Sequence, residues 1–506
     1  MQLFRSSIFR VAATVAFLTF GQLSQASVGA MSAVNVRGFG AVGNGTTDDT
    51  AALNKAIAFA HNAGRSLYLP KGTYKINNAT GPLTFNAFSG AVYGDGSTAT
   101  SIVCTSTKNS CIHFQDPTNL DISKIAVSMA PVFAQCNADT TNCMNFRNNS
   151  RLINTERGTN INIHDVYLHD GSSAGLAIDG ASGVTIQNVS ARRIYGNGFY
   201  ITDDTNVQAS KLSTESSQDA GFEVTKWDSI GENPTPGPCS NITLTGYISF
   251  NDFGAVLVNG CQHVSISSFS VRHTWESAVG VRQDPATTKT QWPDDVTISN
   301  GVIQDVGAGN PPNSAVNAIN LAARGTLGRN LQRVTIHDVS IDGGNSGSIS
   351  VKVEADPTIV VNLANIKVTN AGGSCFDIAG GYVKASSLTC DTAPSTALTI
   401  RTPIEFTGSN FTVRNAPDSG RGDPNSIIVA TRASGIVSLD GVDVTSSLSP
   451  AQVSFEDLDS VGRHKYNGIR LSVRDASKPS ITLQNPAASI SYQLNGGPQL
   501  KMGTQP

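Results

Sequence analysis

Residues 160–166 read NINIHDV, a short run in which apolar and polar side chains alternate from Ile161 onward, and six later segments repeat the pattern. They are GVTIQNV from residue 183, NVQASKL from 206, NITLTGY from 241, HVSISSF from 263, DVTISNG from 295 and RVTIHDV from 333. The opening Ile or Val residues lie 23, 23, 35, 22, 32 and 38 positions apart. A base period of 22–23 residues with insertions indicates a solenoid in which each repeat forms one coil.

A second apolar stretch follows several of these openings and predicts a second strand in each coil. These stretches read GLAID at 175–179, GFYIT at 198–202, GFEVT at 221–225 and GAVLV at 254–258. Propeller blades need about 40–45 residues each, and leucine-rich repeats need Leu where this chain mostly has Val and Ile, so neither fold fits. We expect an all-β solenoid over residues 27–506, a single-stranded right-handed parallel β-helix.

Insertions account for the longer spacings between repeats. They come after Trp227, Arg282 and Val306. On the repeat alignment all three follow the second strand of a coil, so we expect them to rise from one side of the solenoid and to wall a cleft.

The segment before the repeats has a different pattern. A strand is expected to begin at Val34, a helix is predicted over 46–63, and a strand should return over 66–76. Asp48 and Asp49 lie where the helix begins, so capping and the helix dipole explain this acidic pair without a catalytic role. We expect the helix to cover the open end of the solenoid, which otherwise exposes core and unpaired strand edges.

Residues 34–76 read VNVRGFGAVGNGTTDDTAALNKAIAFAHNAGRSLYLPKGTYKI. This stretch resembles the opening of the pectate-lyase-like superfamily of secreted β-helix proteins. The superfamily includes polygalacturonase-type glycosidases, polysaccharide lyases, uronan epimerases and phage tailspikes. The resemblance implies the fold and says almost nothing about the reaction, which has to be argued from the site.

The N-terminus predicts export. Arg5 and Arg10 precede an apolar stretch over 11–20, and Ser24-Gln25-Ala26 offers small residues at cleavage-site spacing. This is the pattern of a secretory signal peptide, expected over residues 1–26 and too short to span a membrane. We therefore expect a secreted or periplasmic protein with no membrane span.

Composition excludes a nucleic-acid partner. The 506 residues carry a formal net charge of −3, and only 14% are Asp, Glu, Lys or Arg, against about 25% in typical soluble proteins. A near-neutral chain without a basic run offers no electrostatic surface for a polyphosphate backbone. Asn, Ser, Thr and Gly supply most of the polarity, which suits short strands and tight turns.

Acidic residues recur just before the second strand of neighbouring coils. The coils read IYGNG, SSQDAG, SFNDFG and HTWESAVG, which aligns Asp219, Asp252 and Glu276 in one column, with Asn197 one coil earlier. Equivalent positions on adjacent coils should lie about 4.8 Å apart. Like charges so close repel, so at least one carboxyl should have a raised pKa or share a cation. Arg282 follows in the last coil.

The resemblance suggests two chemistries for this column. Polygalacturonases place acids before one strand in NTD, DD and GHG motifs, with RIK further on. Here GNG, QDAG, NDFG and Arg282-Gln283-Asp284 take comparable places, without the double aspartate or the histidine. In pectate lyases, three acids hold calcium and an arginine is the base, which implies Asp219, Asp252 and Glu276 as calcium ligands.

Aromatic and polar residues near the acids are candidate substrate contacts. All three tryptophans of the chain fall in this window, and indoles on a surface groove commonly stack on sugar faces. Tyr200 and Glu223 should line the floor of the groove, and Lys226 and His273 its flanks. With Asn197, the predicted substrate-binding residues also include Trp227, Trp275 and Trp292.

These residues predict an enzyme that cleaves an acidic, uronic-acid-containing polysaccharide. We expect hydrolysis with inversion and without a cofactor, with Asp252 as general acid and Asp219 or Glu276 positioning the water. Arg282 is expected to hold a substrate carboxylate. A calcium-dependent lyase on the same substrate class is the alternative, and a non-catalytic carbohydrate-binding β-helix is the alternative outside enzymes.

Cysteine spacing tests the alignment. Cys239 and Cys261 each lie three residues before a strand opening, so they hold the same position on adjacent coils. The expected Cα separation of about 5 Å suits a disulfide, and we predict that bridge. Proximity in sequence suggests Cys104–Cys111 and Cys136–Cys143, which leaves Cys375 and Cys390.

Overall fold

The computed structural model describes residues 32–130, 150–227, 237–283, 290–307, 316–323, 332–344, 349–354 and 359–503, the last range with short gaps at 395, 402, 415–424, 432–434, 447–451, 458–462, 474–479, 484–485 and 487. The predicted signal peptide, Cys136, Cys143, Asp284 and most of the inserted segments lie outside these residues.

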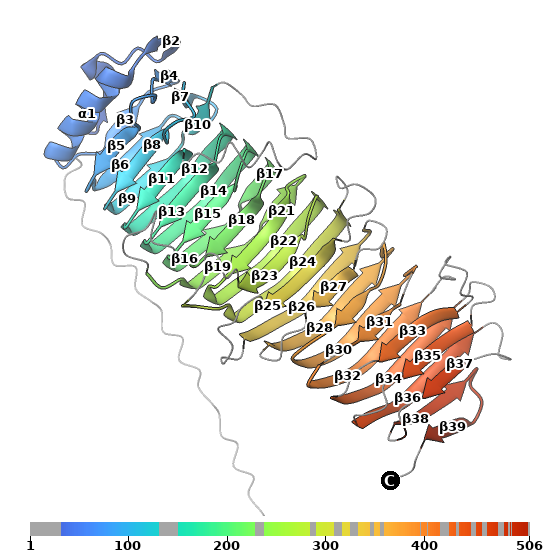
Figure 1. The fold of residues 1–506 in the computed structure, drawn as a ribbon. Coiled ribbons are helices and arrows are strands. Elements are labelled where there is room, and N and C mark those ends of the chain that lie inside the picture. The colour runs from blue at the N-terminus through green and yellow to red at the C-terminus, as the bar shows by residue number, and fades with distance from the viewer. Residues whose placement is uncertain are drawn as a thin grey trace, which may run out of the picture. The chain divides into compact units, whose positions relative to one another are not determined.

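Two parallel sheets build the described chain, and their strands follow one another as a stack of coils (Figure 1). The first sheet has 24 described strands: β1 (Val34–Asn35), β2 (Asn44–Asp48), β3 (Leu67–Leu69), β4 (Gly72–Ile76), β6 (Gly90–Gly94), β7 (Thr100–Cys104), β9 (Thr118–Ser123), β10 (Ala126–Met129), β12 (Thr159–Gly171), β14 (Ser182–Ile194), β16 (Thr205–Ser210), β17 (Ser213–Ser217), β19 (Ser240–Thr245), β20 (Ile248–Phe250), β22 (Gln262–Thr274), β24 (Asp294–Val306), β26 (Gln332–Asp342), β28 (Ile359–Thr369), β30 (Tyr382–Asp391), β32 (Glu405–Arg414), β34 (Ile436–Ser446), β36 (Arg463–Val473), β38 (Ser489–Leu494) and β39 (Gln499–Gly503). The second sheet has 15 described strands: β5 (Leu83–Asn86), β8 (Ile112–Gln115), β11 (Arg151–Glu156), β13 (Ala174–Asp179), β15 (Phe199–Thr202), β18 (Ala220–Thr225), β21 (Gly254–Asn259), β23 (Val279–Gln283), β25 (Asn317–Ala323), β27 (Ile349–Val353), β29 (Phe376–Ile378), β31 (Leu398–Ile400), β33 (Asn425–Thr431), β35 (Gln452–Asp457) and β37 (Ser480–Leu483). Among the described pairings only β38 with β39 is antiparallel.

The register of the first sheet is the one that the repeat predicts. Each of the first six strand openings pairs with the opening of the next coil, in the order Ile161, Val184, Val207, Ile242, Val264, Val296, Val334. One insertion is misplaced by the sequence alignment, because Val306 ends β24 of the first sheet, so that insertion precedes a second-sheet strand instead of following one.

A column of left-handed residues turns the chain within each coil. Asp165 interrupts β12 at φ +55° and Asn188 interrupts β14 at φ +53°, one coil apart. Asn, Asp and Gly tolerate this conformation, which explains their abundance at this position. The Asn188 Nδ2 atom donates to Asp165 Oδ1 at 2.5 Å, which ties the two coils together. The same position on other coils holds Lys124, Lys211, Gly246, Ser268, Asn300, Asp338, Asn365, Ser387, Asn410, Gly441 and Gly468.

Inward side chains stack between the sheets to make a continuous core. Ile161, Val184 and Val207 are fully buried in successive coils, as are Phe199 and Phe222 from the second sheet. The Phe199 and Phe222 ring centroids lie 6.2 Å apart. A single coil has no such partner for its inner face, so the coils stabilise one another.

The helix α1 (Thr50–Asn62) begins four residues later than predicted, because residues 44–48 form β2 and pair with β4. Its buried residues face η1 (Val36–Phe39) and the first strands of the chain. Asp48 accepts a hydrogen bond from the Thr50 backbone N–H at 3.0 Å, as expected for a residue near a helix start. The Asp49 side chain does not cap the helix; it accepts from the Val42 and Gly43 backbone N–H groups instead.

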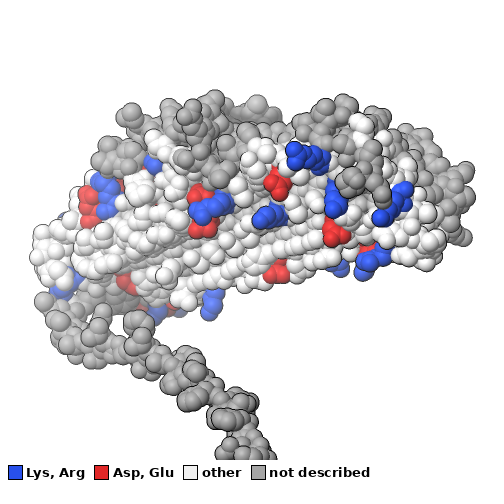
Figure 2. Space-filling model, turned by 90° about the horizontal axis from the view of Figure 1, so that it is seen from below, with Lys and Arg blue, Asp and Glu red and all other residues white. Residues whose placement is uncertain are grey.

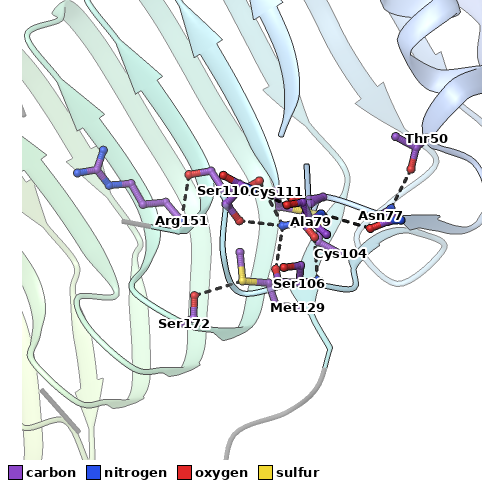
Figure 3. Close-up of a disulfide and its surroundings, with 12 residues drawn as sticks. Thr50, Asn77, Ala79, Cys104, Ser106, Ser110, Cys111, Met129, Arg151 and Ser172 are labelled. Atoms are coloured by element: carbon purple, nitrogen blue, oxygen red, sulfur yellow. Dashed lines mark hydrogen bonds between the residues drawn. A yellow bond between two sulfur atoms is a disulfide. The ribbon is translucent and has the colours of Figure 1, made fainter. Parts of the chain in front are cut away.

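Three disulfides join described cysteines. Cys239–Cys261 links adjacent coils at a Cα separation of 4.8 Å, which confirms the predicted bridge. Cys104–Cys111 is also confirmed, and Figure 3 shows it beside the Ser110 and Ser106 turn close to the start of the stack. The two remaining described cysteines pair as Cys375–Cys390.

Candidate functional site

A cavity of roughly 220 Å³ opens on the outer face of the second sheet, over β18, β21, β23 and β25. Three of the predicted catalytic residues line it: Asp219, Glu276 and Arg282. The other described residues of its wall are Ala220, Phe253, Gly254, Val256, Leu257, Ser277, Gly280 and Asn320.

Strand register sets the spacing of the two acids. Ala220 pairs with Gly254, which puts Asp219 level with Phe253 on the following coil. Glu276 lies one coil further on, and its backbone N–H donates to the Phe253 carbonyl. Asp219 and Glu276 therefore lie two coils apart with Phe253 between them. At about 4.8 Å per coil, their backbones are separated by roughly 9.6 Å.

Asp252 does not belong to this column, and the prediction that it does is wrong. Its side chain is fully buried inside the solenoid, where it accepts hydrogen bonds from Thr214 Oγ1 at 2.5 Å, Ser249 Oγ at 2.6 Å and the Ser217 N–H at 2.7 Å. Burial raises the pKa of Asp252 to about 6, against the lowering effect of these donors. The expected rise is thus present, but its cause is loss of water, not neighbouring carboxylates.

A one-residue slip explains the misplacement. The sequence alignment matched Gly221 with Gly254, whereas the structure pairs Ala220 with Gly254. Gly221 therefore matches Ala255. A shift by one residue moves a strand side chain to the opposite face of a sheet, and Asp252 accordingly points into the core.

Arg282 is the cation of the cavity. It pairs in register with Asn259 on β21 and Ala322 on β25. Its Nε atom is buried without a hydrogen-bond partner, and within the described part of the chain its guanidinium makes no ion pair. An arginine held in this way has its donors available for an anionic ligand.

Three of the predicted substrate contacts lie beside the cavity, Asn197 and Tyr200 on the coil before it and Glu223 on β18. Tyr200 pairs in register with Glu223, and Glu223 pairs with Leu257 of the cavity wall. The Asn197 Nδ2 atom donates to Glu223 Oε2 at 2.6 Å. Burial, followed by the Glu223 charge, raises the pKa of Tyr200, so this side chain stays neutral. These residues continue the outer face toward the N-terminus but do not line the cavity.

Lys226 is not a groove residue. Its ammonium lies 3.1 Å from Asp203 Oδ1, and both side chains are buried. The Trp227 backbone N–H donates to the same carboxylate at 3.0 Å. This ion pair fixes the start of the segment after β18, so a structural role for Lys226 replaces the predicted substrate contact.

Three further predicted substrate contacts lie outside the cavity wall. His273 is the penultimate residue of β22 in the first sheet, with its ring centroid 5.7 Å from that of Phe250. Trp275 donates from Nε1 to Asn251 Oδ1 at 3.2 Å, and Trp292 lies half-buried just before β24. None of these side chains is among the described residues that line the cavity.

Sequence reasoning missed a second carboxylate pair on the same sheet face. Glu156 and Asp179 pair in register on adjacent coils. Glu156 accepts from Asn154 Nδ2 at 3.0 Å and lies 3.3 Å from His113 Nε2; the His113 contact holds its pKa at about 2, despite burial. Burial raises the pKa of Asp179 to about 6, although Arg151 opposes the shift. The signal was available in GLAID, since its last residue falls on the outer face.

Phe253, Ser277 and Asn320 were also missed as wall residues. Phe253 and Ser277 adjoin residues that the sequence singled out, but only the register reveals that they face outward. Asn320 lies on β25, outside every quoted motif, and faces the cavity because it pairs with Gly280.

The calcium site expected for a lyase does not form as predicted. Its three proposed ligands do not converge, because Asp252 faces the core while Asp219 and Glu276 face the cavity. Over the residues that the structure describes, no group of three His, Cys, Asp or Glu side chains is arranged to hold a metal ion.

Described charged side chains are scattered over one face of the molecule and form no large patch there. On the face seen in Figure 2, described acidic and basic side chains form small separate groups and no continuous band of either sign. Contacts with a charged polymer on that face must therefore come from individual side chains.

No described helix is long and apolar enough to cross a membrane.

The comparisons with known proteins agree with this architecture. Residues 33–234 match the family Rhamnogalacturonase A/epimerase, pectate lyase-like. The structure superposes on the catalytic domain of a GH87 α-1,3-glucanase in complex with nigerose with a TM-score of 0.51 at 12% identity, covering 84% of this chain and 69% of that one. It superposes on the pre-mature bacteriophage phi29 gene product 12 with a TM-score of 0.57 at 15% identity, covering 87% and 60%. At these identities the likeness concerns the fold.

Two short matches come from Azotobacter vinelandii. A mannuronan C5-epimerase is 49% identical over 49 residues, 10% of this chain and 4% of the relative. An alginate lyase is 52% identical over 44 residues, 8% of this chain and 5% of the relative. The chain thus spans only a few per cent of these relatives. With the family match and the fold, they confirm the resemblance to the pectate-lyase-like β-helix superfamily.

Proposed function

We propose that this chain is an exported enzyme that hydrolyses glycosidic bonds in an acidic polysaccharide at the cavity on the second sheet. The observation that carries the proposal is the pair of carboxylates, Asp219 and Glu276, lining one cavity together with Arg282. The disulfides support export, because such bonds persist in oxidising compartments.

The spacing of the two acids favours inversion. Inverting glycosidases separate their carboxyl groups by about 6.5–9.5 Å, which leaves room for a water, and retaining enzymes by about 5–5.5 Å. Asp219 and Glu276, with backbones roughly 9.6 Å apart over two coils, reach the first range once their side chains lean together. One acts as the acid that protonates the leaving oxygen, and the other as the base that activates water on the far side of the sugar ring.

Arg282 selects the substrate class in this proposal. The Arg282 guanidinium lies in the cavity wall and its Nε atom has no hydrogen-bond partner among the residues that the structure describes, so it suits a sugar carboxylate, which it can bind with two parallel N–H donors. A neutral sugar offers these N–H donors no carboxylate to bind, so uronic-acid polymers should be favoured.

The known relatives support a polysaccharide substrate. Their names describe a glucanase, a mannuronan epimerase and an alginate lyase, and the family is named for a rhamnogalacturonase and an epimerase. These names differ in reaction, so the choice of hydrolysis rests on the two carboxylates.

Retaining hydrolysis at Glu156 and Asp179 is the second candidate. These two carboxyls lie one coil apart, about 4.8 Å between backbones, which is close to the retaining distance. One is held ionised with a pKa of about 2 and the other has a pKa of about 6, the division that a nucleophile and an acid need.

Incubation of the purified chain with pectic, alginate and bacterial acidic polysaccharides tests the proposal. Reducing ends and ultraviolet absorbance are followed together, because hydrolysis yields the first alone and elimination yields both. Asp219→Asn and Glu276→Gln are expected to lower turnover by roughly two to four orders of magnitude. Glu215→Gln on the first sheet is the matched control and should leave turnover unchanged.

Each failure has a separate meaning. An ultraviolet-absorbing product contradicts hydrolysis. Full activity in both cavity variants, with loss in Glu156→Gln and Asp179→Asn, transfers the reaction to the second pair. Activity that survives all four substitutions overturns the assignment of catalysis to this face.

A further inference from the structure

A second cavity, of roughly 210 Å³, lies on the outer face of the first sheet, over β28, β30 and β32. It is formed on the opposite sheet from the carboxylate cavity and shares no described lining residue with it. Such a volume is below the ~300 Å³ of pockets for drug-sized ligands, so it suits a single ring.

Strand register arranges its wall as two short rows. Val360, Tyr382 and Glu405 pair in one row across three adjacent strands. Asn362, Lys384 and Thr407 pair in the other, two residues further along each strand and therefore on the same face.

The first row offers an aromatic surface. Tyr382 is 39% exposed, so part of its aromatic ring is open to a ligand. Ile436 pairs in register with Glu405 and is also exposed, which extends the apolar edge of the row by one coil. An exposed ring with an apolar border suits the C–H face of a sugar.

The second row offers donors and acceptors. The exposed Lys384 ammonium makes no ion pair or side-chain hydrogen bond with any residue that the structure describes. Asn362 and Thr407 pair with Lys384 in register on either side, Glu405 lines the same cavity, and Thr407 Oγ1 lies 3.5 Å from Glu405 Oε1. Amide, hydroxyl and carboxylate groups pair with sugar hydroxyls, and a lysine pairs with a sugar carboxylate.

We propose that this cavity is a non-catalytic binding site for one uronic-acid unit of a polysaccharide, with the ring packed on Tyr382 and the carboxylate on Lys384. The site goes beyond the proposed hydrolase activity and needs no turnover. Two contacts on one molecule raise the effective concentration of a long polymer at the first cavity, so the second site should favour long chains over short ones.

Titration calorimetry with trigalacturonate, trimannuronate and maltotriose tests the site in the full chain. The Asp219→Asn/Glu276→Gln variant serves as background, which prevents turnover. Tyr382→Ala is expected to weaken binding of an acidic trimer at one site by roughly tenfold, and Tyr382→Phe should preserve it. Lys384→Gln should weaken binding of the acidic trimers and leave maltotriose unaffected. Lys367→Gln, an exposed lysine of β28 outside the cavity, is the matched control.

The outcomes separate this site from the proposed reaction. Loss of acidic-trimer binding in Tyr382→Ala supports the site even if no polymer is cleaved. Unchanged affinity in Tyr382→Ala and Lys384→Gln overturns it even if the enzyme is active, and so does an equal loss in Lys367→Gln. Equal affinity for maltotriose and the acidic trimers contradicts the choice of an acidic sugar.

Discussion

Asp252→Asn separates a catalytic role from a role in the core. The sequence alignment predicted Asp252 as the general acid, and on that basis the substitution should reduce turnover by roughly two to four orders of magnitude. The structure places the side chain away from the cavity, in a hydrogen-bonded cluster inside the solenoid. We therefore expect turnover to stay within about twofold of the native value.

Asp252→Asn should instead change how the free energy of unfolding depends on pH. The pKa of Asp252 is raised from 3.8 to about 6 by burial, so between these values the folded state holds a proton that the unfolded state releases. Folded stability consequently falls as pH rises through this window and is level above it. At 1.36 kcal/mol for each pKa unit, a rise from 3.8 to about 6 amounts to about 3 kcal/mol over the whole window, of which about 2 kcal/mol falls between pH 4.5 and pH 7.

Asparagine has the shape of the acid and does not titrate. The Ser217 N–H can still donate to its amide oxygen, and the Thr214 and Ser249 hydroxyls can rotate to accept from its amide nitrogen. The loss of about 2 kcal/mol of folded stability between pH 4.5 and pH 7 should therefore disappear in the variant. Urea unfolding at pH 4.5 and pH 7, compared with the native chain, measures the difference.

Asp440→Asn is the matched control, since Asp440 is exposed and the chemical change is the same. It should leave both turnover and the pH dependence unchanged. A hundredfold loss of turnover in Asp252→Asn with native pH dependence of stability would refute the reasoning and restore the sequence-based role.

Three further predictions follow from packing and register. Gly301→Ala puts a Cβ 2.0 Å from the buried Phe269 ring and should lower the urea midpoint by the equivalent of about 1–3 kcal/mol; an unchanged midpoint would contradict the packing. The double substitution Cys239→Ser and Cys261→Ser removes a disulfide between residues 22 apart and should lower the free energy of unfolding by about 3 kcal/mol, relative to the native chain without reductant. A loss below about 1 kcal/mol would contradict the presence of this disulfide. Arg282→Gln should raise KM for an acidic polymer roughly tenfold with a smaller effect on kcat, and steady-state kinetics giving the opposite split would exclude carboxylate binding.

The fold was predictable because the repeat is strongly patterned. Strand openings such as Val184 and Val207 are buried at equivalent positions of successive coils. Only one strand register keeps these apolar side chains on the inner face. The disulfide between Cys239 and Cys261 followed from that register without further assumptions.

The site was predictable only in part, because it depends on the second sheet. There the coils lack a uniform motif, and the glycines at 221 and 254 suggested an alignment one residue away from the true one. Asp219, Glu276 and Arg282 lie together along one cavity, as the sequence predicts, whereas Asp252 is buried in the core. Lys226 was misjudged for a different reason, since its buried partner Asp203 lies on the preceding coil.

The ladder of coils divides distance along the solenoid into fixed steps of about 4.8 Å. Two acids of one column therefore cannot drift gradually apart or together. A change from the two-step spacing of Asp219 and Glu276 to the one-step spacing of Glu156 and Asp179 requires loss of a whole coil, or transfer of a carboxylate to the position of Phe253 on the coil between them. In this architecture the number of coils between two carboxylates sets their separation. The choice between inversion and retention therefore changes in whole coil steps and not by the gradual reshaping of loops.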